Sequence, residues 1–196
     1  TSATALVDGV LDKEAGGAIA VFRSLVKHQA GDYLDPILMT GSTVLVDDDL
    51  AERFLERASG WMKERDLEVT FLDRAHDGYH EIHGRGKHWV PRYYSLMITE
   101  LFQEGFTRCI VGTRGLLGEG WDASRINVLV DMTTVTTSMS INQLRGRSIR
   151  LDKEWKEKVA NNWDIVCIAD EFTKGFDDYE RFKQKHKQLY GVCDDG

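Results

Sequence analysis

The residues best suited to binding or catalysis lie between Gln143 and Arg150, in the run Gln-Leu-Arg-Gly-Arg-Ser-Ile-Arg. If this run is helical, Gln143, Arg147 and Arg150 share one face, because positions i, i+4 and i+7 nearly superpose at about 3.6 residues per turn. Two guanidinium groups one turn apart present forked donors that suit phosphate oxygens. Gly146 leaves room beside them for another backbone or a nucleotide, at a helix cost of about 1 kcal/mol. The pattern therefore predicts a helix face that contacts phosphate.

A glycine-rich stretch upstream, residues 112–122, is a second candidate ligand-binding segment. It follows the apolar run 109–111, contains four glycines and ends in Gly-Trp-Asp. Glycines let a loop backbone approach a ligand closely, and the Thr113 hydroxyl with nearby backbone N–H groups could cradle a phosphate. Residues 126–131, between the two segments, have the apolar composition of a buried strand.

Together these segments resemble motifs V and VI of the superfamily 2 helicases and translocases, in the family's order of strand, motif V, strand and motif VI. The resemblance implies the C-terminal RecA-like lobe of a two-lobed motor. Arg147 and Arg150 would be catalytic arginine fingers on ATP phosphates held by the neighbouring lobe, with Gln143 orienting an arginine or bridging to the nucleotide. Such fingers can contribute roughly 10³–10⁵ in rate.

The same resemblance assigns the remaining candidate ligand-binding residues. Gly120 and Asp122 would lie near the nucleotide ribose, and Gly146 beside the nucleotide. Contacts to the nucleic-acid backbone would come from Thr113, Arg114, Thr40 and Ser42. The interval from Thr113 to Gly120 is one residue longer than in DEAD-box proteins. This spacing favours DNA over RNA as the partner.

The chain contains no Gly-x-x-x-x-Gly-Lys-Ser/Thr sequence, which would cradle a triphosphate and its Mg²⁺. We therefore expect ATP and Mg²⁺ to be bound mainly by an N-terminal RecA-like lobe of the same protein. The chain would then be a fragment of a larger protein and would hydrolyse ATP negligibly when isolated.

Two alternatives belong to other classes of protein. The first is a non-catalytic RecA-like interaction domain that binds a protein or nucleic-acid partner. The second is a complete small nucleotide-binding enzyme that uses Asp170 and Glu171, after the apolar run 165–169, as metal ligands. The missing phosphate-binding loop argues against the second alternative.

The periodicity of apolar residues predicts alternating helices and strands. We expect helices at 15–29, 47–64, 91–105 and 179–190, and strands at 36–40, 67–72, 109–111, 126–131 and 165–169. Alternation of this kind predicts one α/β domain over residues 1–196 with a mainly parallel central sheet. The resemblance makes it a three-layer, RecA-like (P-loop NTPase-like) domain. The last helix, with Lys183, Lys185 and Lys187, is interpreted as a solvated face.

Four of the six histidines lie in the segment 76–89. One interpretation is a mobile loop that turns Arg85, Lys87 and His88 toward nucleic acid, with Tyr79 or Trp89 available to stack on bases. Another is a solvated loop without a role. A zinc site formed by His76, His80 and His83 is a third, although no Cys accompanies them and their spacing matches no common zinc pattern. We therefore predict no metal site.

The composition is that of an ordinary globular protein, with 42% hydrophobic and 29% charged residues. The formal charge of −7 argues against a free-standing domain held to nucleic acid by bulk electrostatics. No run approaches the ~18 apolar residues of a membrane helix, so no membrane partner is expected. The three scattered cysteines suit a reducing, cytoplasmic location.

Overall fold

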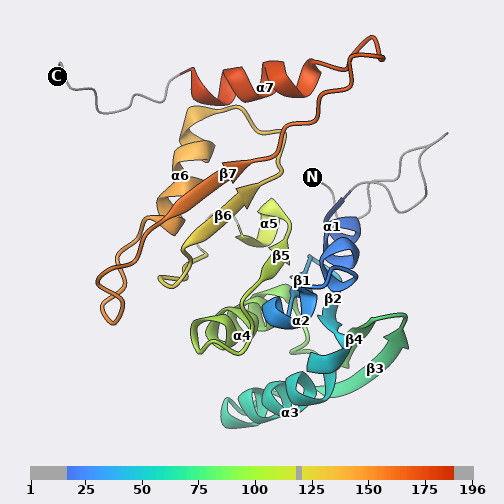
Figure 1. Cartoon of the computed structure of the whole chain (residues 1–196). Helices are drawn as coiled ribbons and strands as arrows, with labels where there is room; N and C mark the ends of the chain where they lie inside the picture. Colours follow the sequence, from blue (N-terminus) through green and yellow to red (C-terminus); the bar gives the residue numbers. More distant parts are fainter. Residues whose placement is uncertain (1–16, 118–120, 188–196) are drawn as a thin grey trace. The chain divides into compact units, whose positions relative to one another are not determined.

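The computed structural model describes residues 17–117 and 121–187 (Figure 1). The chain divides into two compact units, Thr1–Trp121 and Asp122–Gly196, and each contains its own sheet. Within the described ranges, no helix combines the length and apolar character needed to cross a bilayer. The single domain expected over residues 1–196 stays a prediction.

The first unit is built on a five-stranded sheet with the strand order β3-β4-β2-β1-β5. Its elements are α1 (Gly17–Val26), α2 (Gly31–Leu34), β1 (Ile37–Met39), β2 (Val44–Asp47), α3 (Asp48–Glu64), β3 (Thr70–His76), β4 (Tyr79–Arg85), α4 (Pro91–Gln103), β5 (Ile110–Gly112) and α5 (Arg114–Leu117). The helices expected at 15–29, 47–64 and 91–105 are confirmed as α1, α3 and α4. The strands expected at 36–40 and 109–111 are confirmed as β1 and β5.

Helices pack on both faces of this sheet, because successive strand residues point to opposite sides. Ile37 and Met39 of β1 face the main apolar cluster, to which α3 and α4 contribute. Leu38, between them, faces a smaller cluster with Phe22 of α1. All three β1 side chains are fully buried, so β1 lies at the centre of the unit.

The prediction of a mainly parallel sheet is wrong for this unit. Only β1 and β5 pair in parallel, whereas the β1–β2, β2–β4 and β3–β4 pairs are antiparallel. The sequence interpretation missed β2, because the short apolar run 44–46 follows the Gly41-Ser42-Thr43 turn at once and precedes a strong helix signal at Asp47. Two apolar runs joined by such a turn indicate a hairpin. The coarser prediction of an α/β fold is confirmed.

The segment expected to be a loop, 76–89, instead contains strand β4 and most of a hairpin. Strand β3 begins at Thr70 rather than at residue 67, and His76 pairs with Tyr79 across the two-residue connection Asp77-Gly78. Gly78 adopts a φ of 80°, a backbone conformation that favours glycine. Asp-Gly between two possible strands is a hairpin signal, so the sequence of this segment carries a local indication of the turn.

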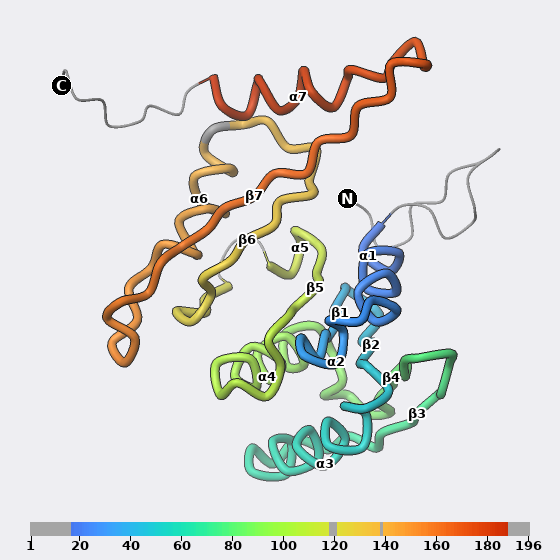
Figure 2. Tube along the Cα trace, viewed as in Figure 1, coloured from blue at the N-terminus to red at the C-terminus, as the bar shows by residue number. Residues whose placement is uncertain are grey.

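The second unit is a parallel strand pair connected by a helix. Figure 2 shows its chain trace running from β6 through α6 to β7 and α7. Its elements are β6 (Val128–Asp131), α6 (Ser138–Ser148), β7 (Asn161–Asp164) and α7 (Asp177–His186). Strand β6 and helix α7 agree with the expected elements. Val128 pairs with Asn161 and Asp131 pairs with Asp164, so the carboxyl ends of both strands lie together.

The predicted strand at 165–169 is wrong, because β7 occupies the polar residues 161–164 that precede it. Past Asp164, the Ile165 amide still donates to the Asp131 carbonyl at 3.3 Å. Ile165 and Ile168 are more than half exposed. The apolar run 165–169 would pair well as a strand. Instead, polar side chains of α6 and α7 bind Asn162 and Asp164, so the preceding residues 161–164 pair with β6.

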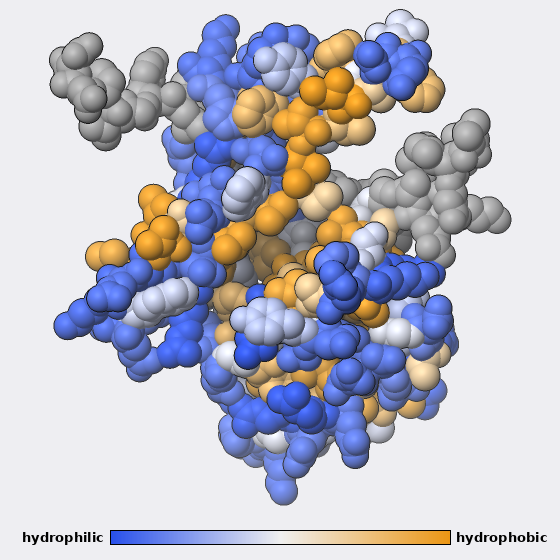
Figure 3. Space-filling view, viewed as in Figure 1, coloured by the Kyte–Doolittle hydropathy of each residue, from blue (hydrophilic) through white to orange (hydrophobic). Residues whose placement is uncertain are grey.

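Among the described residues of this unit, the buried side chains are more often polar or charged than apolar. Its described buried apolar residues are Ala123, Ile126 and Ile141, whereas its described buried polar or charged residues are Asp131, Arg147, Ser148, Asp152 and Lys185. Conversely, Val128, Val130 and Trp163 of the two strands are about half exposed or more. Figure 3 shows apolar side chains on the viewed surface over these strands.

Candidate functional site

The last residue of the glycine-rich segment, Asp122, and the arginine-rich segment both belong to the second unit and meet there. Helix α6 ends at Ser148, and Ile149 caps it, so Arg150 lies in the turn beyond the helix. The Arg150 guanidinium forms an ion pair with the carboxylate of Asp122, from the end of the glycine-rich segment. The structure therefore brings together two of the residues predicted to surround the nucleotide.

Arg147 stands beside this pair but is much less accessible, with 7% of its surface exposed. Its Nε donates to the backbone carbonyl of Gln143 at 3.3 Å. Burial, followed by the positive charge of Arg150, lowers the pKa of Arg147 from its ordinary value, and Asp122 partly opposes the shift. Arg147 therefore lies within the electrostatic influence of one guanidinium group, that of Arg150, and one carboxylate, that of Asp122.

The expectation that Gln143, Arg147 and Arg150 share one helix face is corrected for Arg150, which lies past the last helical residue. Gln143 and Arg147 are one turn apart within α6, although the Gln143 side chain is exposed while Arg147 is buried. A Cβ at Gly146 would meet no atom within 4 Å, so the space beside this glycine is open. Gly120 lies outside the described residues.

A set of short polar contacts holds the chain on both sides of the Asp122–Arg150 pair. Lys158 Nζ donates to the backbone carbonyls of Ser124 (2.5 Å) and Arg150 (2.6 Å), and thereby joins the segments that carry the two partners. Ser124 Oγ in turn donates to Asp152 Oδ2 at 2.5 Å. This hydrogen bond is the largest cause that lowers the pKa of Asp152, while burial lowers the pKa of Lys158.

A second polar cluster, at the carboxyl ends of β6 and β7, was missed by sequence reasoning. Asp164 Oδ2 accepts from Arg145 Nη2 of α6 at 2.6 Å, and Asp164 Oδ1 accepts from Lys185 Nζ of α7 at 3.1 Å. Lys185 also donates to Asp131 Oδ2 at 3.0 Å. The interpretation of Lys185 as part of a solvated face is therefore wrong, since its side chain is only 5% exposed.

Two further contacts complete the cluster. Asp131 Oδ1 accepts a hydrogen bond from the Thr133 amide at 2.8 Å. Burial alone would raise the pKa of Asp131, but the hydrogen bonds from Thr133 and Lys185 outweigh burial and lower the pKa from its ordinary value. His186 Nε2 lies 2.9 Å from Arg145 Nη2, while His186 Nδ1 lies 2.8 Å from the Phe182 carbonyl. His186 Nε2 also lies 3.7 Å from Asp164 Oδ2, so the ring is in contact with both partners of the Arg145–Asp164 pair. A signal in the sequence was the acidic residue at the end of the strand 126–131.

The predicted nucleic-acid contacts lie in the first unit, at the carboxyl ends of neighbouring parallel strands. Met39 pairs with Gly112, so Thr40 and Thr113 follow β1 and β5 at the same edge of the sheet. The Thr40 hydroxyl accepts the amides of Ser42 (3.3 Å) and Thr43 (3.0 Å). Since Thr40 is also 1% exposed, it stabilises the turn rather than presenting its hydroxyl to a ligand, whereas Ser42 is exposed.

The start of the glycine-rich segment forms one helical turn, α5, rather than an open loop. The amides of Leu116 and Leu117 both donate to the Thr113 carbonyl at 3.0 Å. A Cβ at Gly112 would lie 2.6 Å from the Leu117 side chain, which explains the glycine as a packing requirement. Arg114, the first residue of α5, is exposed at this edge.

The histidines predicted as alternative zinc ligands do not converge. His80 faces Asp73, with 2.7 Å between Nδ1 and Oδ1, while His76 and His83 lie 3.6 and 3.1 Å from Glu81. His80 alternates with Glu81 and His83 along β4 and therefore lies on the opposite face of the sheet. Among the residues that the structure describes, no group of three or more His, Cys, Asp or Glu side chains is arranged to hold a metal ion.

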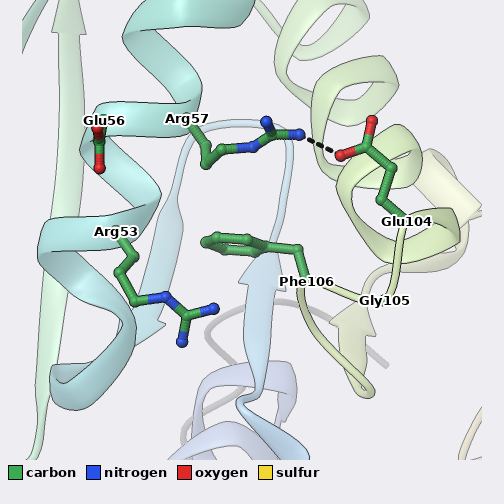
Figure 4. A pocket seen from close by; sticks show the side chains of 6 residues that line it. All are labelled: Arg53, Glu56, Arg57, Glu104, Gly105 and Phe106. Atoms are coloured by element: carbon green, nitrogen blue, oxygen red, sulfur yellow. Dashed lines mark hydrogen bonds and ion pairs between the residues drawn. The ribbon is translucent and has the colours of Figure 1, made fainter.

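An open pocket of about 400 Å³ lies in the first unit. Figure 4 shows the Phe106 ring between Arg53 and Arg57, with Arg57 paired to Glu104. The Arg53 guanidinium carbon is 5.2 Å from the ring centroid. Gly105 and Glu56 complete the lining, and none of the predicted site residues contributes to it.

No family model matches the chain, and no curated protein or solved structure shows significant similarity to it. Among the predicted site residues, Asp122, Arg147 and Arg150 are grouped in one unit, and Thr40, Ser42, Thr113 and Arg114 are grouped at one sheet edge of the other.

Proposed function

We propose that this chain is the C-terminal RecA-like lobe of an ATP-dependent superfamily 2 helicase or translocase. The observation that carries the proposal is the group formed by Asp122, Arg147 and Arg150, in which Arg150 forms an ion pair with Asp122 and the charges of both act on the buried Arg147. Guanidinium groups gathered in this way suit phosphate oxygens. In the proposed reaction, Arg147 and Arg150 stabilise the charge that develops on the γ-phosphate.

The fold supports this proposal in part. The parallel pair β1–β5 and the parallel β6–α6–β7 unit are arrangements expected in a RecA-like domain, where ligands bind at the carboxyl ends of strands. The antiparallel strands β2, β4 and β3 would be an extension of that plan. We propose that the nucleic-acid strand, with DNA favoured over RNA, contacts Ser42, Thr113 and Arg114.

The group of Asp122, Arg147 and Arg150 suits contacts to phosphate and not the binding of Mg²⁺, because it contains one carboxylate and two cations. The described part of the chain has no convergent group of three acidic or histidine side chains for a metal ion. An N-terminal lobe of the same protein would therefore supply the Mg²⁺ site and the phosphate-binding loop. The free thiols of Cys109 and Cys167 suit the reducing cytoplasm that we propose as the location.

The test is ATP hydrolysis by this chain and by the longest natural gene product, each with and without single- and double-stranded DNA and RNA. We expect the chain alone to be inactive and the longer product to be stimulated by nucleic acid. In that product, Arg147→Ala should abolish hydrolysis and retain ATP binding, while Arg181→Ala, a control on α7, should leave both unchanged. Hydrolysis retained by Arg147→Ala would exclude the arginine-finger role.

A non-catalytic RecA-like interaction domain is the second candidate. It is favoured by the half-exposed Val128, Val130 and Trp163 on β6 and β7, since exposed apolar patches often mark interaction sites. The absence of ATP hydrolysis in both the chain and the longer product would support this function over the first.

A further inference from the structure

Helix α6 is attached to its sheet mainly through polar groups. Ile141 is its buried apolar residue among those described, whereas Met139 is 73% exposed. Apolar packing alone would leave such a helix free to adjust its rotation, because it is non-directional. Hydrogen bonds, by contrast, require defined geometry.

Two side chains of α6 bond to two side chains of β7. Arg145 Nη2 donates to Asp164 Oδ2 at 2.6 Å, and Ser148 Oγ donates to Asn162 Oδ1 at 2.7 Å. Residues 145 and 148 are three apart and share a helix face, while residues 162 and 164 share a strand face. The two contacts therefore fix both the rotation and the axial position of α6.

The carboxylate of Asp164 is itself held in place. Its side chain is 6% exposed, and its other oxygen accepts from Lys185 at 3.1 Å. Lys185 also bonds to Asp131, so its ammonium group joins the two carboxylates of this cluster, while Arg145 binds the second oxygen of Asp164. Movement of these groups is opposed, because it would leave a buried charge unpaired.

Arg145 and Arg147 are two residues apart and thus project to nearly opposite sides of α6. We propose that Arg145 and Asp164 are positioning residues, which orient α6 so that Arg147, and Arg150 after the helix end, present their guanidinium groups to phosphate. This inference rests on the proposed function for the nature of the ligand. Its structural part, the orientation of Arg147 and Arg150 by the Arg145–Asp164 bond, can be tested without that function.

The experiment compares Arg145→Met with Arg145→Lys, which keeps a cation beside Asp164, and with Arg181→Met as a matched control. Arg181 is on α7 in the same unit and forms its ion pair with Asp178 of the same helix. In ¹⁵N-labelled chain, the side-chain Nε–H signals of Arg147 and Arg150 report their surroundings. We expect these signals to shift in Arg145→Met, to return toward the wild-type positions in Arg145→Lys, and to stay unchanged in Arg181→Met.

In the longest natural gene product, the same Arg145→Met change should lower kcat for ATP hydrolysis on the order of 100-fold, with KM little changed, because small misplacements of catalytic groups have effects of this size. Thermal melting of each variant shows whether it remains folded. If Arg145→Met fails to fold, Ser148→Ala, which removes only one hydroxyl, replaces it and should shift the same signals.

The outcomes separate the two proposals. Unchanged Arg147 and Arg150 signals in a folded Arg145→Met chain would overturn the positioning role, whatever the activity. Wild-type protein without ATP hydrolysis would overturn the proposed function, while shifted arginine signals would still support the positioning role. Equal kcat values for ATP hydrolysis in wild type and Arg145→Met would also overturn the positioning role.

Discussion

Lys185 on α7 reaches across the second unit to Asp131 at the end of β6, with 3.0 Å between Nζ and Oδ2, and both side chains are at most 5% exposed. The same ammonium group also binds Asp164 at the end of β7. One ammonium group of the last helix therefore pairs with the carboxylates at the ends of both strands. We infer that the stability of this unit's interior depends on Lys185.

We predict that Lys185→Met destabilises the chain by about 3–5 kcal/mol, because it leaves two carboxylates buried with one fewer cation. Lys183→Met is the control, since Lys183 forms an exposed pair with Glu180 and should change stability by less than about 1 kcal/mol. Urea unfolding monitored by circular dichroism measures both. Equal effects of the two changes would show that the buried pairing contributes nothing.

The stability of the first unit should depend on pH through Asp47. This residue, the last of β2 and the N-cap of α3, is 3% exposed, and its Oδ2 has no hydrogen-bond partner among the described residues. Burial, followed by the neighbouring Asp48, raises the pKa of Asp47 to about 6. In the unfolded chain the pKa would be near 3.9, so the folded state binds the proton more tightly.

The sign of the effect follows from this difference. The contribution of protonated Asp47 to stability is complete below about pH 4 and is lost as the pH rises through 6, where the ionised carboxylate must be buried. Asp47→Asn should therefore increase the free energy of unfolding at pH 8 by roughly 2–3 kcal/mol and have little effect near pH 4. Urea unfolding at both pH values measures the change, with Asp49→Asn, at the exposed Asp49, as the control. A gain of equal size at pH 4 and pH 8 would contradict the assignment to ionisation.

Local signals in the sequence predicted most helices and the strands β1, β5 and β6, because apolar periodicity and breakers such as Pro91 act within a few residues. The position of β7 could not be obtained in this way. Its residues Asn162 and Asp164 are poor strand formers, and they are held by partners on α6 and α7. Strand pairing that depends on such distant polar contacts leaves no periodic pattern.

The candidate site shows the same division. The spacing of Gln143, Arg147 and Arg150 identified the arginine-rich segment, but it could not show that the helix ends before Arg150. The ion pair between Arg150 and Asp122 joins residues 28 positions apart. Asp164 and Lys185 were not identified, because a lysine on a polar helix is exposed far more often than buried.

Asp122 should compete with added anions for Arg150, because their ion pair is partly exposed. We predict that Asp122→Asn increases the affinity of the chain for pyrophosphate by about two- to fivefold, the range expected for loss of an exposed pair. Pyrophosphate is the probe because it lacks a ribose, so a ribose contact by Asp122 cannot contribute. Isothermal titration calorimetry at low salt measures the affinity. The increase should vanish in an Arg150→Ala background, and an increase that persists there would show that Asp122 acts elsewhere.

Gly146 should separate stability from function. It lies inside α6, and a Cβ added there would meet no atom within 4 Å. Gly146→Ala is therefore expected to stabilise the chain by about 0.5–1 kcal/mol, because alanine loses less backbone entropy in a helix. If a nucleotide occupies the open space, the same change should lower ATP hydrolysis by the longest natural gene product. Gly60→Ala in α3, where a Cβ also meets no atom within 4 Å, should give a similar gain in stability and leave hydrolysis unchanged. Undiminished hydrolysis with Gly146→Ala would place the nucleotide away from this helix face.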